Sequence, residues 1–138
     1  MTRRIRRDAQ GAAVIEMALS LPILTVMIYG IFILGQLFEA NAGMQHALGE
    51  GARYGTLCLS MSSTGVCTQA TDTQLSAKVN SKLFGTRNGT FDAPSVDSTT
   101  VASGYKTITV TYHQTMNFLL FRGPTINITR SKRVYVAS

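Results

Sequence analysis

Charged side chains are scarce in this sequence, and the groups used for acid and base catalysis are scarcer still. Only 14% of the 138 residues are Asp, Glu, Lys or Arg, seven of these are acidic, and there are two histidines. No HExxH, GxSxG, P-loop or glycine-rich phosphate turn occurs, and neither His46 nor His113 has a carboxylate or cysteine at a spacing typical of a catalytic site. The sequence therefore predicts no enzyme and no cofactor.

Cysteine is equally rare. Cys58 and Cys67 enclose a short segment rich in Ser, Thr and Gly. Eight intervening residues are not a metal-ligand spacing and no histidine is near, so we expect no metal site. In an oxidising compartment a disulfide closing this loop would contribute about 2.5 to 3 kcal/mol in the chain-entropy model. Two unpaired thiols are the alternative.

The basic surplus is concentrated at one end. The formal net charge is +6, yet Arg3, Arg4, Arg6 and Arg7 all precede residue 12. Beyond them the basic residues form no stripe interleaved with aromatics that could follow a phosphate backbone. Nucleic acid is therefore not an expected partner.

A long apolar segment follows the arginines. Nineteen residues from Met17 to Gly35 carry no charge, and only Gln36 interrupts the apolar run up to Phe38. A hydrocarbon core about 30 Å thick needs about 20 helical residues, whereas the core of a secretory signal has about 7 to 15. We therefore predict a transmembrane helix over residues 12–38. By the positive-inside rule, the arginines hold its start in the cytoplasm and place residues 40–138 outside.

Ordinary signal cleavage is an alternative to this anchor. Ala40 and Ala42 imitate the small-residue pattern of a cleavage site, and the product would be a secreted protein that starts near residue 43.

The helix is expected to continue as an amphipathic extension over residues 39–58. From Asn41 to Leu59, apolar and small residues recur at spacings of three and four: Met44, Ala47, Leu48, Gly51, Ala52, Gly55 and Leu59. A helix continuous to about Thr56 would be near 65 Å long, and its stripe would need a cover from downstream. Gly51 and Gly55 share a face that permits close approach of another backbone. Because interior glycines weaken helices, a break around Gly49 is the alternative.

Residues 59–138 are expected to form one small extracytoplasmic α+β domain. Residues 60–73 are predicted to be a loop. A short helix should begin at Thr71 or Asp72, and Gly85 suits its end. Its apolar face would contain Leu75, Val79 and Leu83.

The strand signal lies near the end of the chain. Lys106–His113 alternates β-branched polar and apolar residues and is the best predicted strand. Asn117–Phe121 is a second candidate and Ile126–Val136 a third, with a turn at Arg122-Gly123-Pro124. Residues 86–104 are expected to be a loop around one weak strand. The predicted fold is α+β: a long N-terminal helix packed on a small antiparallel sheet, with one short extra helix.

Glu16 is unusual because it opens the apolar helix. A carboxylate inside a membrane span costs about 2.5 to 3.5 kcal/mol at mid-membrane and less near the edge, so Glu16 should have a partner or a route to water. The simpler interpretation is that Glu16 favours the positive end of the helix dipole and reaches the headgroup layer.

A basic leader, a glycine, and a glutamate five residues later resemble the processing site of type IV pilin-like proteins. The run Gly11-Ala-Ala-Val-Ile-Glu16-Met-Ala-Leu-Ser-Leu-Pro22, then Gly30 and Gly35, then Glu50-Gly-Ala-Arg-Tyr-Gly55, is similar to the TadE family of the tight-adherence (Flp) pilus system. The resemblance covers about residues 8–56 and implies a type IV pilin-like fold. Its helix-packing positions would be Pro22, Gly30, Gly35, Gly51 and Gly55.

The resemblance also implies a role as a minor pilin or pseudopilin. Residues 1–11 would be a leader cut off after Gly11 by a prepilin peptidase, which makes Ala12 the new N-terminus. The Glu16 carboxylate of one subunit could then pair with the α-amino group of its neighbour and fix the register. The implied partners are the inner membrane, the peptidase, other pilin or TadE-like subunits and the pilus assembly platform.

Two residues of this segment are unusual: Met17 differs from the Flp pilin pattern, and Pro22 is unfavourable inside a helix. Met17 stands where Flp pilins commonly have Phe or Tyr, although it keeps the apolar character. Pro22 removes an amide that would bond Ala18 and should kink or loosen the helix; a tolerated kink without a role in assembly is the alternative.

A protein of a different class would also fit the apolar helix. In this alternative the chain keeps its leader and remains a single-span membrane-anchored binding or scaffold protein of the cell envelope. The residue at the mature N-terminus separates the two readings.

Overall fold

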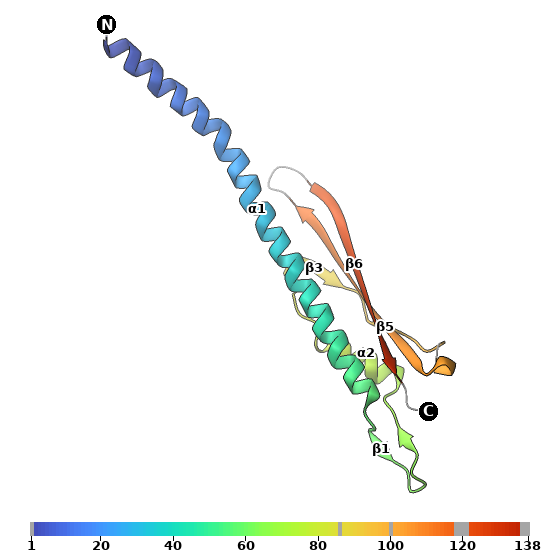
Figure 1. Cartoon of the computed structure of the whole chain (residues 1–138). Coiled ribbons are helices and arrows are strands. Elements are labelled where there is room, and N and C mark those ends of the chain that lie inside the picture. Colours follow the sequence, from blue (N-terminus) through green and yellow to red (C-terminus); the bar gives the residue numbers. More distant parts are fainter. Residues whose placement is uncertain (1, 86, 100, 118–121, 136–138) are drawn as a thin grey trace.

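The computed structural model describes residues 2–85, 87–99, 101–117 and 122–135. It confirms the predicted α+β arrangement, in which a long helix, α1 (Thr2–Thr56), packs along a small antiparallel sheet. The sheet and a short second helix cover only the C-terminal half of α1, and the N-terminal half projects away from them (Figure 1).

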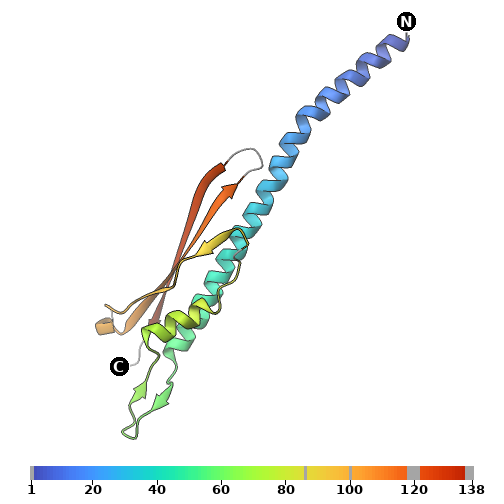
Figure 2. The same ribbon diagram turned by 180° about the vertical axis from the view of Figure 1, so that it is seen from behind.

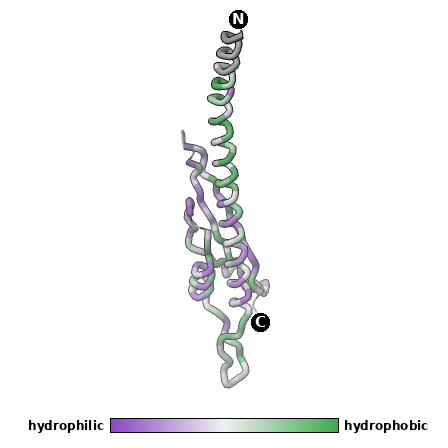
Figure 3. The backbone as a smooth tube through the Cα atoms, turned by 90° about the vertical axis from the view of Figure 1, so that its left-hand side faces the viewer, coloured by the Kyte–Doolittle hydropathy of each residue, from purple (hydrophilic) through white to green (hydrophobic). Residues whose placement is uncertain are grey.

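Helix α1 is continuous. It runs for 55 residues, about 80 Å at 1.5 Å per residue, through Pro22 and the glycines between Gly43 and Gly55. The alternative of a break around Gly49 is therefore wrong, because packing against the sheet outweighs the low helix propensity of glycine. Figure 3 shows the change of character along α1, which is apolar in its free part and mixed beside the sheet.

The main sheet has four antiparallel strands with β5 (Tyr105–Asn117) at its centre. Strand β6 (Arg122–Tyr135) pairs with β5 along its whole length, with Thr111 opposite Thr129 and an irregularity between Thr115 and Asn117. The other edge of β5 is shared by β3 (Gly89–Phe91) and β4 (Ser95–Asp97). The sheet therefore has one long hairpin and two short strands.

Three details of the strand prediction are wrong. Residues 86–104 contain two strands rather than one, and the expected turn at Arg122-Gly123-Pro124 lies inside β6. Pro124 is tolerated there because β6 is at the edge of the sheet, where a strand needs fewer donors. Asn117 ends β5 instead of starting a new strand, and residues 118–121 of that prediction lie outside the described chain.

Helix α2 (Asp72–Asn80) begins as predicted and ends earlier. Thr71 caps it, with a reciprocal bond between Thr71 and Gln74 that forms a capping box. The predicted end at Gly85 is wrong, since Ser81 is already the C-terminal cap. Figure 2 shows α2 lying against α1 near its C-terminal end.

The segment predicted as a loop over residues 60–73 contains a small ribbon. Strand β1 (Ser60–Met61) pairs with β2 (Cys67–Thr68). Such short strands have no periodic signal in the sequence, so only the pairing reveals them. The ribbon lies at the end of the molecule opposite the N-terminus (Figure 1).

The core lies between the apolar stripe of α1, the inner face of the sheet and α2. Its buried residues are Ala40, Met44, Ala47, Leu48, Leu75, Val79, Ile108, Val110, Tyr112 and Val134. The predicted cover of the helix by the sheet is thus confirmed, as is the alternation that buries Ile108, Val110 and Tyr112. Leu59 belonged to the predicted stripe but is exposed, because α1 ends at Thr56.

Candidate assembly site on the N-terminal helix

The free part of α1 is an uncovered apolar rod. Every side chain from Gly11 to Ile28 is exposed, and large apolar ones such as Val14 (68%) and Ile23 (64%) are mostly accessible. A contiguous apolar surface of this kind marks a membrane or protein contact. Within the described chain, the part Gly11–Thr56 of α1 is the one helical segment that is long and apolar enough to cross a membrane.

The uncovered rod ends at Tyr29. The Tyr29 hydroxyl donates a hydrogen bond to the carbonyl of Asn117 at the end of β5, and Ile33 is only 5% exposed. The span predicted over residues 12–38 therefore overlaps a stretch that the domain contacts. The part without such cover, Gly11–Ile28, is shorter than the apolar run in the sequence.

Gln36, the polar residue that interrupts the apolar run, has hydrogen-bond partners in the sheet domain. Its side-chain oxygen accepts hydrogen bonds from the amides of Asn88 at 2.7 Å and Gln114 at 3.3 Å. Gln114 is buried and also accepts a hydrogen bond from the hydroxyl of Tyr112. This polar cluster ties the helix to β5 and to the segment before β3.

Glu16 is the one charged residue between Gly11 and Ile28. Its side chain is exposed on the rod, and among the described residues no hydrogen bond or ion pair holds its carboxylate. A carboxylate on an apolar helix is costly in lipid unless a cation pairs with it. No side chain of residues 11–135 that the structure describes supplies that cation.

The predicted processing position is fully accessible. Gly11 and Ala12 lie within α1 with exposed surfaces, and apart from the helix's own nearby backbone no described atom lies within 4 Å of the place where a Cβ of Gly11 would be. Ala12 and Glu16 are four residues apart, so they lie on one face of the helix about one turn apart. A free amine at residue 12 and the Glu16 carboxylate would thus form an axially spaced pair of opposite charges.

Helix α1 continues through Pro22, and the predicted kink or loosening at this residue stays a prediction. Pro22 has no N–H to offer the carbonyl of Ala18. Nearby, the hydroxyl of Thr25 donates to the carbonyl of Leu21 at 2.8 Å, and that of Ser20 to Met17 at 3.3 Å. These bonds satisfy the two hydroxyls within the helix, which suits an apolar environment.

The four predicted packing glycines fall into two pairs. A Cβ on Gly51 would lie 2.3 Å from Val79, and one on Gly55 would lie 2.5 Å from Val134. These two positions admit α2 and β6 close to α1. Gly30 and Gly35 have no atom within 4 Å of their Cβ positions, so their predicted role in packing stays a prediction about other molecules.

Sequence reasoning missed a third close contact. A Cβ on Gly43 would lie 2.2 Å from the backbone carbonyl oxygen of Phe84. Gly85, which has a φ of +93°, lies against the backbone of Ala40. Only glycine fits this crossing of α1 by the chain after α2. The small residues Ala40, Gly43 and Ala47, spaced by three and four, were the signal that could have indicated it.

The cysteines are bonded, as predicted. Cys58 and Cys67 form a disulfide with a Cα–Cα distance of 5.4 Å, which closes the β1–β2 ribbon where it leaves α1. The bond lies far from the free rod, so it stabilises the opposite end of the domain.

Two titratable side chains, Asp72 and His113, join different elements of the domain. Asp72 receives hydrogen bonds from Lys106 and Ser98, both at 2.6 Å, and these two bonds lower the pKa of its carboxyl. Hydrogen bonds with Asn127 and Asp92 raise the pKa of His113 on the outer face of the sheet. Among the residues that the structure describes, no three His, Cys, Asp or Glu side chains lie close enough together to hold a metal ion.

Comparison with known protein families gives a match that lies within helix α1. The family model described as TadE-like protein matches residues 11–53. The chain is TadE-like over this segment. The resemblance stated from the sequence is confirmed, and TadE-like proteins are a structural, pilus-associated family rather than an enzyme family. Searches of curated proteins and of solved structures found no match.

The TadE-like segment begins at Gly11, the first residue of the exposed rod, and ends at Arg53 near the end of α1. It therefore includes Glu16 and Pro22 as well as Gly51 on the packed face. Family and helix together fit a membrane protein related to the Tad pilus.

Proposed function

We propose that this TadE-like chain is a minor pilin or pseudopilin, a structural subunit in the assembly of a tight-adherence (Flp) pilus. The observation that carries the proposal is the uncovered apolar rod with a single carboxylate, Glu16, five residues after Gly11. A rod of this kind needs lipid around it before assembly and other apolar helices around it afterwards.

The proposal includes removal of the leader. A prepilin peptidase would cut after Gly11, take away the four arginines and expose an α-amino group at Ala12 with an ordinary pKa of about 8. Glycine suits this position because it lowers helix propensity by about 1 kcal/mol, which eases the local opening that proteolysis needs. Loss of the arginines also removes the charge that holds the helix end at the cytoplasmic surface.

Glu16 then acts in subunit pairing. When helices stack in a bundle with an axial offset of about one turn, the amine of one subunit meets the Glu16 carboxylate of the next. Pairing neutralises two charges in an apolar core, and a misplaced subunit would leave both unpaired, so the pair specifies register.

The proposed location is the bacterial inner membrane, with the N-terminus in the cytoplasm and the sheet domain outside, before incorporation in a pilus. The arginines supply the orientation. The Cys58–Cys67 disulfide supports it independently, because disulfides persist in oxidising compartments.

The competing secreted form is disfavoured by the packing of α1. Cleavage near residue 43 would cut the helix where Gly43 contacts Phe84 and would remove Ala40 from the core. An uncleaved anchor keeps the core intact and differs from the pilin only in the retained leader.

Substitution of Glu16 tests the proposal. Glu16→Ala should reduce the number of pili on cells about tenfold or more, since loss of a paired charge in an apolar core costs about 3 to 5 kcal/mol. Membrane insertion and leader cleavage should be unchanged, and Glu16→Asp should restore part of the assembly. Wild-type piliation by Glu16→Ala would exclude the pairing role.

A further inference from the structure

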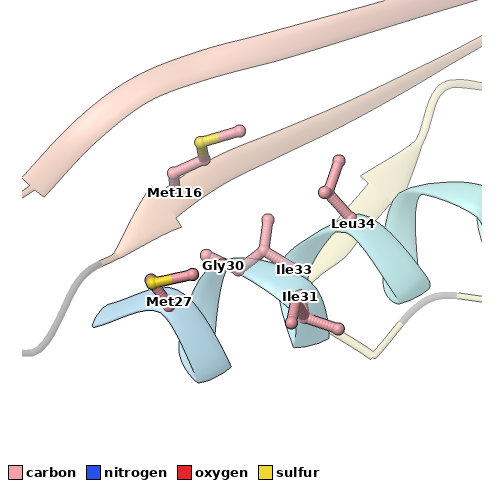
Figure 4. A pocket seen from close by; sticks show the side chains of 6 residues that line it. All are labelled: Met27, Gly30, Ile31, Ile33, Leu34 and Met116. Atoms are coloured by element: carbon pink, nitrogen blue, oxygen red, sulfur yellow. The ribbon is translucent and has the colours of Figure 1, made fainter. Parts of the chain in front are cut away.

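An apolar groove lies where α1 enters the sheet domain. It has a volume of about 370 Å³ and is lined by Met27, Gly30, Ile31, Ile33, Leu34 and Met116. Figure 4 shows that five of these residues come from α1 and that Met116 comes from the end of β5. The groove is open to the outside and none of its side chains is charged.

The position of the groove along the helix follows from the length of the rod. From Gly11 to Tyr29 the helix rises about 27 Å at 1.5 Å per residue, close to the thickness of about 30 Å of a bilayer core. If the rod fills the bilayer, the groove lies at the boundary between the acyl chains and the headgroups of the outer leaflet.

The residues around the groove have the chemistry of that boundary. Tyr29 lies beside it with its hydroxyl on the Asn117 carbonyl, and aromatic residues with a polar tip are enriched at this depth. Arg122 pairs in register with Asn117, so a cation lies at the same level. Cationic side chains are attracted to anionic lipid headgroups.

We infer that this groove holds an acyl chain of a phospholipid from the outer leaflet, with the headgroup beside Arg122. The groove is continuous with the exposed apolar rod, so the lipid that surrounds the rod extends into it without crossing a polar surface. Gly30 leaves the floor open, since no atom lies within 4 Å of its Cβ position. The inference rests on the membrane insertion that forms part of the proposed function.

The absence of tryptophan from the chain provides a direct test. Single substitutions Met116→Trp and Leu34→Trp would report from the two walls of the groove, and either one suffices if the other fails to fold. The full chain is reconstituted in phosphatidylethanolamine and phosphatidylglycerol vesicles whose acyl chains are brominated in their upper half, and fluorescence is compared with unbrominated vesicles.

We expect bromine to lower the emission of both groove variants about twofold or more, because apolar groups at this boundary lie about 5 to 10 Å into the lipid. Tyr135→Trp, at the far end of β6 and 65% exposed, should show no quenching. In the Met116→Trp chain, Gly30→Leu should fill the groove and reduce the quenching, whereas Gly35→Leu, outside the groove, should leave it unchanged.

Quenching of a Leu24→Trp variant shows whether the helix is inserted in the membrane, independently of whether lipid occupies the groove. Leu24 lies in the free rod, so its replacement should be quenched whenever the helix is inserted. Quenching of Leu24→Trp without quenching at the groove overturns the lipid site alone, and absence of both overturns the span and the site. A third outcome is groove tryptophan fluorescence that bromine does not quench but that changes with the protein-to-lipid ratio. This result identifies a second copy of the chain as the occupant and also overturns the lipid site.

Discussion

The side-chain oxygen of Gln36 accepts a hydrogen bond from the Asn88 amide at 2.7 Å, although 52 positions separate the two residues. This contact, with the one from Gln114, explains why an amide interrupts an apolar run that otherwise extends to Phe38. Gln36 is half-buried against the domain, so one face of the apolar helix has already left a purely apolar environment at that position.

Removing this amide should destabilise the domain. Gln36→Leu leaves the Gln114 side chain, 2% exposed, with one partner fewer, and an unsatisfied buried polar group costs about 1 to 3 kcal/mol. Urea unfolding of the detergent-solubilised chain measures the loss. Gln45→Leu, on the exposed face of the same helix, should change the free energy of unfolding by less than about 0.5 kcal/mol. Equal stabilities of the two variants would contradict this role of Gln36.

Gly55 should not tolerate a side chain. Gly55→Ala would put its Cβ 2.5 Å from Val134 and 3.2 Å from Leu75, and we expect a loss of about 1 to 3 kcal/mol despite the better helix propensity of alanine. Gly35→Ala is the matched control: it meets no atom within 4 Å and should stabilise the helix by up to about 1 kcal/mol. A thermal melt of each variant checks the opposite signs. A stabilising Gly55→Ala would show that β6 does not pack closely there.

The disulfide should stabilise the end of the domain. Replacing both Cys58 and Cys67 with serine should cost about 2.5 to 3 kcal/mol in the chain-entropy model for so short a loop. Hydrogen exchange should show faster exchange in Ser60–Thr68 and little change at β5, because the ribbon lies outside the main core. Unchanged exchange in the ribbon would mean that its pairing does not depend on the bond.

Asp72 should make stability depend on acid pH. Hydrogen bonds from Lys106 and Ser98 lower the pKa of its carboxyl below the ordinary 3.8, so its contribution is present above about pH 4 and is lost as the pH falls through the lowered pKa. Asp72→Asn should flatten the decline of the melting temperature over that acidic range. Asp97, whose pKa is also lowered, keeps part of the slope. A variant with the slope of the wild type would exclude the Asp72 contact as a cause.

The long helix and its cover were predictable because both rest on strong periodic signals. The length of the uncharged apolar segment predicted the candidate span. Small and apolar residues at spacings of three and four from Met44 to Gly55 predicted the packed face of the helix. The alternation of polar and apolar residues over Lys106–His113 predicted the central strand. Each signal concerns one element and its own burial pattern, which a single sequence contains in full.

The features that escaped prediction depend on contacts between distant segments. The crossing of Gly43 and Gly85, the pairing of β3 and β4 with β5, and the Gln36 cluster all join residues far apart in the chain. The end of the free rod at Tyr29 was likewise hidden, since hydropathy alone extends the span to Phe38. Glu16 and Gly11 could be singled out from the sequence, because a carboxylate in an apolar helix is conspicuous without any structure.

The residue at the mature N-terminus distinguishes a processed pilin from a permanent membrane anchor. The chain is expressed in cells with a prepilin peptidase, and intact-mass spectrometry is carried out on the membrane fraction. A processed pilin subunit predicts a chain that starts at Ala12 for the wild type and a full-length chain for Gly11→Ala. A wild-type chain that keeps Met1 or Thr2 in the presence of active peptidase would contradict the account and favour a permanent membrane anchor.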